Sequence, residues 1–180
     1  MKTQITEKIA IPSGISCSIN SGVLKCSKAG VDLIKDIHVP GVLVKVEGNE
    51  IVFSCERGTK KDFKSIKSNI AHIKNMFHGL DHKYVYQLES CNVHFPMTFK
   101  VEKDTFFINN FLGEKVPRKA KILPNVVVEV KTNKITVTSH DREAAGQTAA
   151  NLEKATIVRN RDRRIFQDGI YITEKPGREQ

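Results

Sequence analysis

The sequence lacks the long apolar runs that mark membrane-spanning proteins. Nowhere in its 180 residues does it approach the roughly 18 consecutive apolar residues that a transmembrane helix requires. The first residues, MKTQITEK, are polar and charged, so they lack the apolar core of a signal peptide. We therefore expect a soluble, cytoplasmic protein without a membrane partner.

Motifs for catalysis and cofactor binding are also missing. The chain contains no GxSxG, GxxxxGKS/T, GxGxxG or HExxH pattern. Its acidic pairs, such as Asp141 with Glu143, stand where a helix is expected to begin, and the helix dipole accounts for them there. We predict that the protein is not an enzyme and takes no cofactor or small-molecule substrate.

Metal-binding and redox patterns are scarce as well. The four cysteines form no Cys-x-x-Cys pair, and we expect all of them to be reduced, buried and apolar in character: Cys17, Cys26, Cys55 and Cys91. His78 and His82 are four residues apart, a spacing that would place two imidazoles on one face of a continuous helix. Because we expect Gly79 to interrupt that helix, we favour solvent-facing histidines over a metal site.

The charge balance indicates a polyanionic partner. The chain has 29 Lys and Arg against 20 Asp and Glu, a formal net charge of +9. Such an excess favours nucleic acid and, less strongly, an acidic membrane surface.

The sequence contains two similar halves. VKVEGNEIVFS at 44–54 and VEVKTNKITVT at 128–138 both alternate around a turn with an asparagine, as a β-hairpin does. Two further hairpin-like segments, SINSGVLKC at 18–26 and KVEKDTFFI at 100–108, stand at a similar offset. Because order, turn residue and helix phase agree, we favour duplication over chance.

Each half also predicts one helix after its last hairpin. In the first half Thr59 and Asp62 form a capping box, and apolar residues recur at helical spacing: Phe63, Ile66, Ile70, Ile73 and Phe77. In the second half Asp141 can cap the helix, and the inward positions are Ala145, Thr148, Leu152 and Ala155. On another face of this helix, Gln147, Asn151 and Lys154 stand beside Gly146 and Ala150, which leaves room for a contact surface.

The predicted fold class is α+β, with two duplicated domains, each a mostly antiparallel β-sheet packed against one long α-helix. Strands and helices do not alternate regularly, so a doubly wound nucleotide-binding fold is disfavoured. We place the domains at residues 1–81 and 82–180, with the first helix ending near Gly79. A final strand, expected to include Phe166, follows Thr156, and Asp168-Gly169 is expected to form the turn that sets it.

Basic residues cluster in two segments of the second half, GEKVPRKAK at 113–121 and RNRDRR at 159–164. Arginine suits phosphates and exposed bases, so we favour RNA or DNA contact for these segments. The first helix carries a basic face of Lys60, Lys64, Lys67 and Lys74, for which contact and plain solvation are equally acceptable.

Five short strings together resemble the sixth protein of the large ribosomal subunit, in its archaeal and eukaryotic form. They are AHIKNM at 71–76, HFPM at 94–97, NNFLGEK at 109–115, GQTAANLE at 146–153 and RRIFQDGIYI at 163–172. The resemblance runs from about Ile9 to Ile172. It implies two duplicated α+β domains, binding to large-subunit ribosomal RNA, and a place near the sarcin-ricin loop and the translation-factor site.

The resemblance also implies that the second domain, with its C-terminal segment, makes the main RNA contacts. Its partners would be large-subunit ribosomal RNA, neighbouring large-subunit proteins and, transiently, translation factors. The predicted RNA-binding residues are Lys115, Arg118, Lys119, Lys121, Arg142, Gln147, Asn151, Lys154, Arg159, Arg161, Arg163, Arg164 and Lys175. Two departures from the family pattern affect local turns: SKAG at 27–30 replaces a Gly-Pro-Lys-Gly turn, and Ser139-His140 stands where a glycine is common.

Two other functions compete with this one. A tandem KH-like module is disfavoured because no GxxG loop with flanking basic residues is present. An RNA-directed enzyme of unrecognised type is the other alternative. A ribosomal protein is distinguished from both because it would sediment with large subunits.

Overall fold

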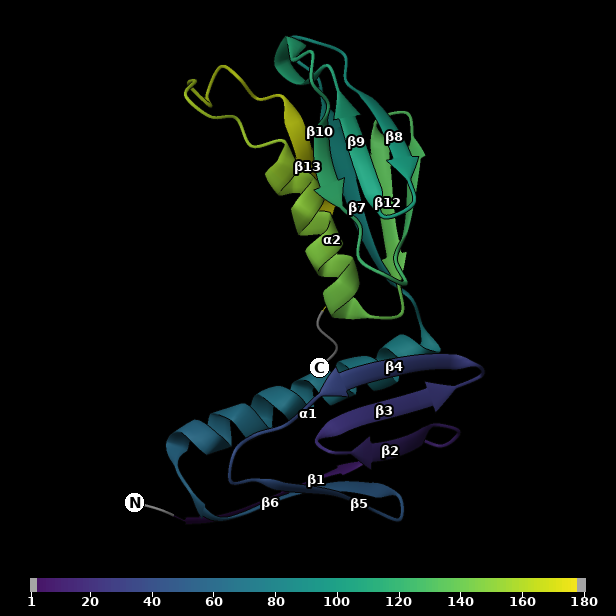
Figure 1. Ribbon diagram of the computed structural model, residues 1–180, viewed down its shortest axis with the longest axis vertical. Coiled ribbons are helices and arrows are strands. Elements are labelled where there is room, and N and C mark those ends of the chain that lie inside the picture. The colour runs from purple at the N-terminus through teal and green to yellow at the C-terminus, as the bar shows by residue number, and fades with distance from the viewer. Residues whose placement is uncertain (1–2, 178–180) are drawn as a thin grey trace. The chain divides into compact units, whose positions relative to one another are not determined.

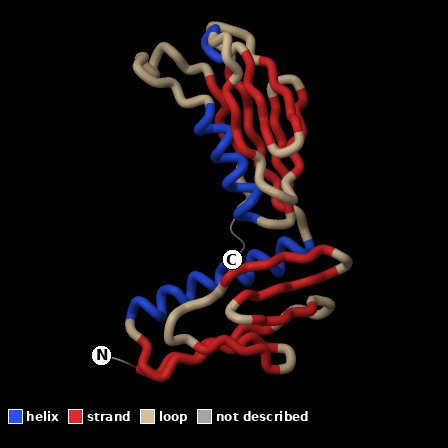
Figure 2. Tube along the Cα trace, viewed as in Figure 1, coloured by secondary structure: helices blue, strands red, loops and turns tan. Residues whose placement is uncertain are grey.

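A computed structural model describes residues 3–177, and the chain divides into two compact units, residues 1–82 (unit 1) and 83–180 (unit 2) (Figure 1). Each unit consists of antiparallel strands and one main helix, as the strand and helix colours of Figure 2 show. The predicted α+β class with two duplicated units is confirmed. Each unit, however, contains two small sheets rather than one.

Unit 1 places its strands in the sheets β1-β6-β5 and β2-β3-β4. The elements are β1 (Thr3–Ala10), β2 (Ser16–Asn20), β3 (Val23–Lys28), β4 (Val31–Asp36), β5 (Leu43–Glu47), β6 (Glu50–Gly58) and α1 (Lys60–Asp81). The helix contacts strands of both sheets, and its Ile66 and Ile73 are fully buried in the core with Phe53 and Leu24. Burial of each such side chain contributes about 1.5–3 kcal/mol, which exceeds what helix propensity alone supplies.

Unit 2 repeats this arrangement and adds one strand. Its elements are β7 (Tyr84–Cys91), β8 (Thr98–Glu102), β9 (Thr105–Asn109), the short 3₁₀ helix η1 (Phe111–Gly113), β10 (Arg118–Lys121), β11 (Val127–Lys131), β12 (Lys134–Ser139), α2 (Arg142–Ala155) and β13 (Gly169–Glu174). The sheets are β11-β12-β7-β13 and β10-β9-β8. The order β5-β6-β1 thus recurs as β11-β12-β7, and β2-β3-β4 recurs as β8-β9-β10.

The hairpins and the helix starts agree with the sequence prediction. Val44 pairs with Phe53 in the first repeat, and Val128 pairs with Val137 in the second. At the start of α1, the Thr59 side chain accepts from the Asp62 N–H while Asp62 accepts from the Thr59 N–H, which is a complete capping box. The segment at 27–30 does form a turn, since Ala29 and Gly30 both have positive φ, 50° and 83°.

The prediction that Gly79 interrupts α1 is wrong. Gly79 is buried inside the helix, which continues to Asp81 and ends where the His82 N–H donates to the His78 carbonyl at 2.8 Å. A glycine inside a helix costs only about 1 kcal/mol relative to alanine, and burial of Leu80 in the next position outweighs that cost. His78 and His82 therefore do lie close, with ring centroids 5.4 Å apart.

Three further expectations need correction. Phe63 was expected to face the core, but its position at the first turn of α1 leaves it 42% exposed. Cys26 and Cys55 are buried, whereas Cys91 is exposed because it ends β7, and Cys17 is only partly covered. Phe166 precedes the final strand, which begins at Gly169.

Cys17 of β2 and Cys26 of β3 stand opposite each other on the two neighbouring strands, with their sulfur atoms 3.0 Å apart.

Candidate nucleic-acid interface

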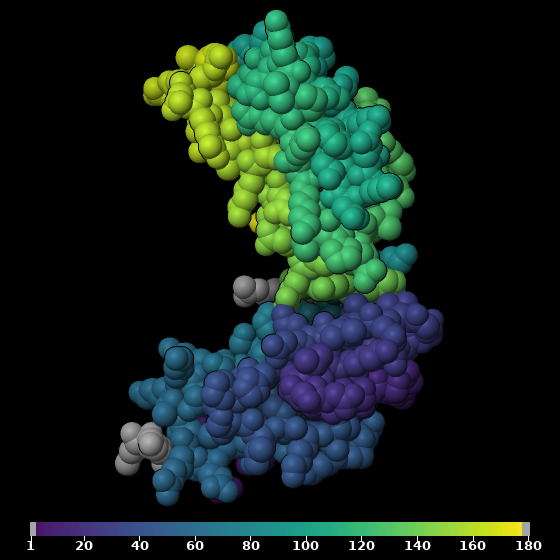
Figure 3. All heavy atoms as spheres, in the orientation of Figure 1, coloured from purple at the N-terminus to yellow at the C-terminus, as the bar shows by residue number. Residues whose placement is uncertain are grey.

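One end of unit 2 gathers most of the predicted RNA-binding arginines. The loop between α2 and β13 contains the RNRDRR segment and stands out from the body of the unit (Figures 1 and 3). All four arginines of this loop are exposed: Arg159, Arg161, Arg163 and Arg164. Arg164 folds back onto Asp162, whose carboxylate accepts from its Nη2 at 2.9 Å. The hydrogen bonds from Arg164 lower the pKa of Asp162, so this carboxylate stays ionised and offsets one positive charge.

A stack of side chains joins this loop to the loop that follows β7. The guanidinium of Arg161 lies over the Phe166 ring, 4.7 Å from its centroid. On the other side, Phe166 stacks on His94, with centroids 4.7 Å apart and the planes within 18° of parallel. The core packing predicted for Phe166 is only part of its role, because the ring is half-buried and also carries the arginine. The stack thus presents a charged planar group at the surface.

Asp168 fixes the inner end of the stack. Its carboxylate is 1% exposed and accepts from the backbone N–H groups of Val93 and His94, at 2.8 and 2.9 Å, and from His94 Nδ1 at 2.6 Å. Burial raises the pKa of Asp168, but the hydrogen bonds from His94 and Val93 outweigh it and leave the pKa below its ordinary value. The turn expected at Asp168-Gly169 is therefore a buried link between two loops, not a simple surface turn.

Exposed apolar side chains are carried by this loop and by two others at the same end of unit 2. Val116, Ile165 and Val93 are 76%, 62% and 61% exposed. The loops that carry them are joined, since Asn110 Nδ2 donates to the Pro96 carbonyl at 3.0 Å. We call this end of unit 2, formed by residues 91–97, 110–117 and 156–168, the loop end. Lys115 lies there and is exposed. A mixed apolar and basic surface suits RNA whose bases are partly unstacked.

Arg118 differs from the other predicted contacts because its donors are engaged within the unit. Nε and Nη2 donate to both carboxylate oxygens of Glu114, at 2.8 and 2.6 Å, and this pairing lowers the Glu114 pKa. Nη1 donates to the carbonyls of Ala155 and Ile157 at the end of α2, at 2.9 and 3.1 Å. The group also lies 4.1 Å from the centroid of the Phe111 ring. Arg118 therefore caps α2 and holds the 110–117 loop.

The outer face of the β8-β9-β10 sheet carries a second group of cations. Lys119 and Lys121 are exposed on β10, and they stand opposite Phe107 and Thr105 of β9. Lys119 Nζ lies 5.5 Å from the centroid of the half-buried Phe107 ring. Lys100 of β8 pairs with Phe107 from the other side, so the aromatic ring has a lysine on each neighbouring strand.

The face of α2 predicted to touch RNA lies beside that sheet. Gln147 Nε2 donates to Asn151 Oδ1, and Asn151 Nδ2 donates to the Lys121 carbonyl, each at 2.9 Å. Lys154 is exposed on the same helix. The space left by the missing side chain of Gly146 is occupied by Tyr86 of β7, because a Cβ at position 146 would lie only 2.8 Å from the Tyr86 hydroxyl. Gly146 thus serves packing between helix and sheet rather than approach of another surface.

The last two predicted contacts lie away from the loop end. Arg142 begins α2, lies over the Tyr84 ring at 5.6 Å, and donates to the carbonyls of Pro176 and Gly177 at 3.4 Å. Lys175 is exposed after β13. The structure therefore brings together Lys115 with the loop arginines, and separately Lys119 and Lys121 with the amides of α2. Arg142 and Lys175 lie in a third region, at the start of α2 and just after β13.

Sequence reasoning missed His94, Phe95 and Lys100. The string HFPM did point to the first two, but nothing in it indicates that His94 meets Asp168 or that the Phe95 ring lies against Gly113. Such contacts join segments far apart in the chain. Ser139 stands just before α2, where a glycine is common in the family. Its Oγ donates to the Asn125 carbonyl at 2.7 Å and accepts from the Asp141 N–H at 3.1 Å, and these two bonds hold the start of the helix.

The described part of the chain contains neither a cluster of metal-ligating side chains nor a membrane-spanning helix. Residues 3–177 contain no group of three or more His, Cys, Asp or Glu side chains that could hold a metal ion. No helix within the same range is both long and apolar enough to cross a membrane. The exposed arginines, Lys115 and the exposed apolar side chains make the loop end the main candidate for a binding surface in unit 2.

Comparison with known proteins gives consistent matches. Residues 95–169 match the family described as Ribosomal protein L6. The chain is 39% identical over 167 residues to the large ribosomal subunit protein uL6 of Methanospirillum hungatei, which covers 93% of this chain and 95% of the relative. It is 38% identical over 174 residues to uL6 of Methanococcus vannielii, which covers 97% of this chain and 96% of the relative. The similarity therefore extends across both units.

Proposed function

The chain belongs to the ribosomal protein L6 family, the uL6 proteins of the large ribosomal subunit, and from this membership we propose that it is a structural component of that subunit which binds its ribosomal RNA. The relatives carry the name of a ribosomal protein and not of an enzyme. The protein's role is then to hold RNA in the shape that translation requires, in the cytoplasm and among neighbouring large-subunit proteins.

The loop end of unit 2 is the main RNA contact in this proposal. The observation that carries it is the stack in which Asp168 holds His94, His94 stacks on Phe166, and Phe166 supports Arg161. A guanidinium held in this way loses less side-chain entropy on binding a phosphate or a base than a freely rotating one. The neighbouring exposed arginines add charge that displaces counterions from the RNA, so affinity falls as salt rises.

The outer face of β8-β9-β10 is the second RNA contact. Lys119 and Lys121 neutralise phosphates, while Phe107 offers a partly exposed ring between lysines on two strands. Duplex RNA has a deep, narrow major groove that side chains do not read, so recognition relies on shape and on unpaired bases. Gln147 and Asn151 contribute uncharged donors beside this face.

We place the bound protein near the sarcin-ricin loop and the translation-factor site, where unit 1 would meet factors only transiently. Hydroxyl-radical footprinting of large subunits with and without this chain tests the placement. Protection of nucleotides in or beside the sarcin-ricin loop is the expected result. Protection confined to a distant region of the RNA would contradict the placement while leaving RNA binding intact.

Arginine substitutions test the assignment to the loop end. Replacing Arg161, Arg163 and Arg164 together by alanine should weaken binding to large-subunit RNA by at least about tenfold at moderate salt, since roughly three phosphate contacts are lost. The matched control replaces Lys60, Lys64 and Lys67, which removes equal charge from unit 1. Filter binding over a salt series measures both. Equal losses from the two triple variants would contradict the assignment of the main contact to unit 2.

A further inference from the structure

The two units differ in what lies beside their first strand. In unit 2, β13 pairs antiparallel with β7, from Gly169 opposite Cys91 to Glu174 opposite Gln87. In unit 1 the equivalent sheet has the order β1-β6-β5, and within residues 3–177 no strand pairs with the other edge of β1. An exposed strand edge is a template for pairing with another chain.

Hydrogen-bonding groups of β1 point to this open edge. The Ile11 N–H donates to the Asn49 carbonyl, just as the Ser90 N–H donates to the Asn133 carbonyl in unit 2. Because backbone groups alternate along a strand, the N–H and C=O groups of Thr6, Lys8 and Ala10 face away from β6. Glu89 and Gln87, the equivalent residues of β7, are partnered by Tyr171 and Glu174 of β13.

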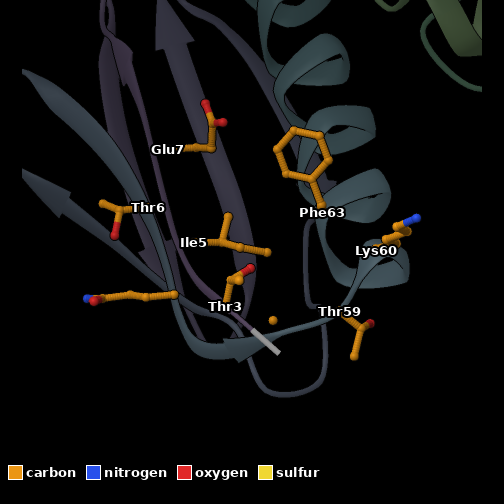
Figure 4. A pocket seen from close by; sticks show the side chains of 9 residues that line it. Thr3, Ile5, Thr6, Glu7, Thr59, Lys60 and Phe63 are labelled. Atoms are coloured by element: carbon orange, nitrogen blue, oxygen red, sulfur yellow. The ribbon is translucent and has the colours of Figure 1, made fainter. Parts of the chain in front are cut away.

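A hollow of ≈ 470 Å³ lies between β1 and the first turn of α1 (Figure 4). It is lined by the start of β1 and the start of the helix, at Thr3, Gln4, Ile5, Thr6, Glu7, Gly58, Thr59, Lys60 and Phe63. Phe63, 42% exposed, extends from the helix toward the strand. The hollow therefore combines an apolar wall with a strand edge.

In unit 2 the chain itself reaches the corresponding place. Lys60 and Phe63 are the first and fourth residues of α1, and Arg142 and Ala145 hold those positions in α2. Arg142 donates to the carbonyls of Pro176 and Gly177, so the extended segment after β13 passes the first turn of α2. The duplicated fold thus shows what kind of segment the hollow of unit 1 accepts.

We propose that this hollow and the open edge of β1 bind an extended segment of another protein, which adds as a strand antiparallel to β1. Ile170 and Ile172 of β13 face the core of unit 2, so the segment carries apolar residues at alternate positions, facing Phe63 and Ile5. It is also acidic, because Lys60 lines the hollow and Lys64 is exposed one turn further along α1, while Glu7 already pairs with Lys67 at 2.8 Å. The inference concerns protein contacts of unit 1 and goes beyond RNA binding by unit 2.

Cross-linking in cells identifies the occupant. The full chain carries Phe63→p-benzoylphenylalanine, which keeps an aromatic ring in the hollow, and the control carries the same residue at Ile34, an exposed apolar position on β4. After irradiation, the Phe63 variant should cross-link to one acidic, alternately apolar segment of another protein, mapped by mass spectrometry. Cross-links to RNA, to a second copy of this chain, or equally from both variants would overturn the proposal. Sedimentation of the same variants reports the proposed function separately.

Backbone variants distinguish strand addition from side-chain contact. Thr6→Pro removes one edge N–H without breaking a β1-β6 hydrogen bond, and Thr6→Val keeps that N–H. The cross-link from position 63 should fall by about tenfold or more with Thr6→Pro and persist with Thr6→Val. Hydrogen exchange provides a readout without substitution: amides of Thr6, Lys8 and Ala10 should exchange at least about tenfold more slowly in cosedimenting complexes than in the free chain. Unchanged exchange at all three would overturn the proposal.

Discussion

The carboxylate of Asp168 joins two loops that are 74 residues apart in the chain, by accepting from His94. Neither loop has regular secondary structure, so the three hydrogen bonds to this buried group set the position of both. Gly146 also determines a contact between elements, because the absence of a Cβ allows Tyr86 to lie against α2. We therefore expect substitutions at Asp168 and Gly146 to change the stability of the fold.

Replacing Asp168 by asparagine should lower the free energy of unfolding by about 1–3 kcal/mol at pH 7, because the amide cannot accept all three bonds. The pKa of Asp168 lies below its ordinary value, so its ionised form stabilises the fold above about pH 4, and this contribution is lost as pH falls through the lower folded-state pKa. Urea denaturation at pH 7 and near pH 3 measures the difference, which should shrink on acidification. The exposed Asp104→Asn control should change little, and a pH-independent effect of Asp168→Asn would contradict this role.

Gly146→Ala should also destabilise the chain, although alanine is the better helix former by about 1 kcal/mol. The added Cβ would stand 2.8 Å from the Tyr86 hydroxyl and 3.3 Å from Cζ of the same ring, and such overpacking costs about 1–3 kcal/mol. In a Tyr86→Phe background the closest atom is gone, and the same substitution should become neutral or stabilising. Urea denaturation of the four proteins in this cycle provides the comparison. Stabilisation by Gly146→Ala in both backgrounds would show that the contact is unimportant.

At the scale of elements, the C-terminal end of α2 is held by Arg118 in addition to its own residues, since Thr156 and Ile157 already donate to the Glu153 and Lys154 carbonyls. Helix carbonyls at a C-terminus lack intrahelical partners, and Arg118 donates to Ala155 and Ile157 from a neighbouring strand. The same side chain pairs with Glu114 and so fixes the loop before β10. Arg118 therefore supports the loop end of unit 2 without adding a free cation to it.

Arg118→Lys should lower the free energy of unfolding by about 1–3 kcal/mol, because a lysine cannot bridge a carboxylate and two carbonyls at once. The neighbouring Lys119→Ala should leave stability within about 0.5 kcal/mol and instead weaken RNA binding. Urea denaturation and filter binding on both variants separate the structural cation from the RNA-facing one. A stable Arg118→Lys protein with weakened RNA binding would reverse the two roles.

Local signals in the sequence predicted the elements well. Alternation around Asn49 and Asn133 gave both hairpins, and Thr59 with Asp62 gave the start of α1. The prediction that Gly79 ends α1 was wrong because burial of Leu80 outweighs the cost of a glycine inside the helix. The candidate site was predictable only as clusters of charge, since the bonds of Arg118 and Asp168 depend on contacts between segments distant in the chain. The alternation of apolar and polar residues also did not indicate that the strands of each unit form two sheets.

At the scale of the whole molecule, duplication has produced two units with the same topology and different open surfaces. Unit 2 closes its first strand with β13 and gathers arginines at the loop that leads to it. Unit 1 leaves the edge of β1 unpaired within residues 3–177 and carries five exposed lysines along α1. In the two proposals above, unit 2 binds RNA and unit 1 binds another protein.

Sedimentation of cell extract on a sucrose gradient tests the central claim, that this chain is an RNA-bound component of the large ribosomal subunit. At low salt the chain should cosediment with large subunits. High salt should release it, since phosphate contacts are screened. The Arg161, Arg163 and Arg164 triple variant should be released at lower salt than the wild-type chain. Finding the wild-type chain only in the soluble top fractions at low salt would contradict the account.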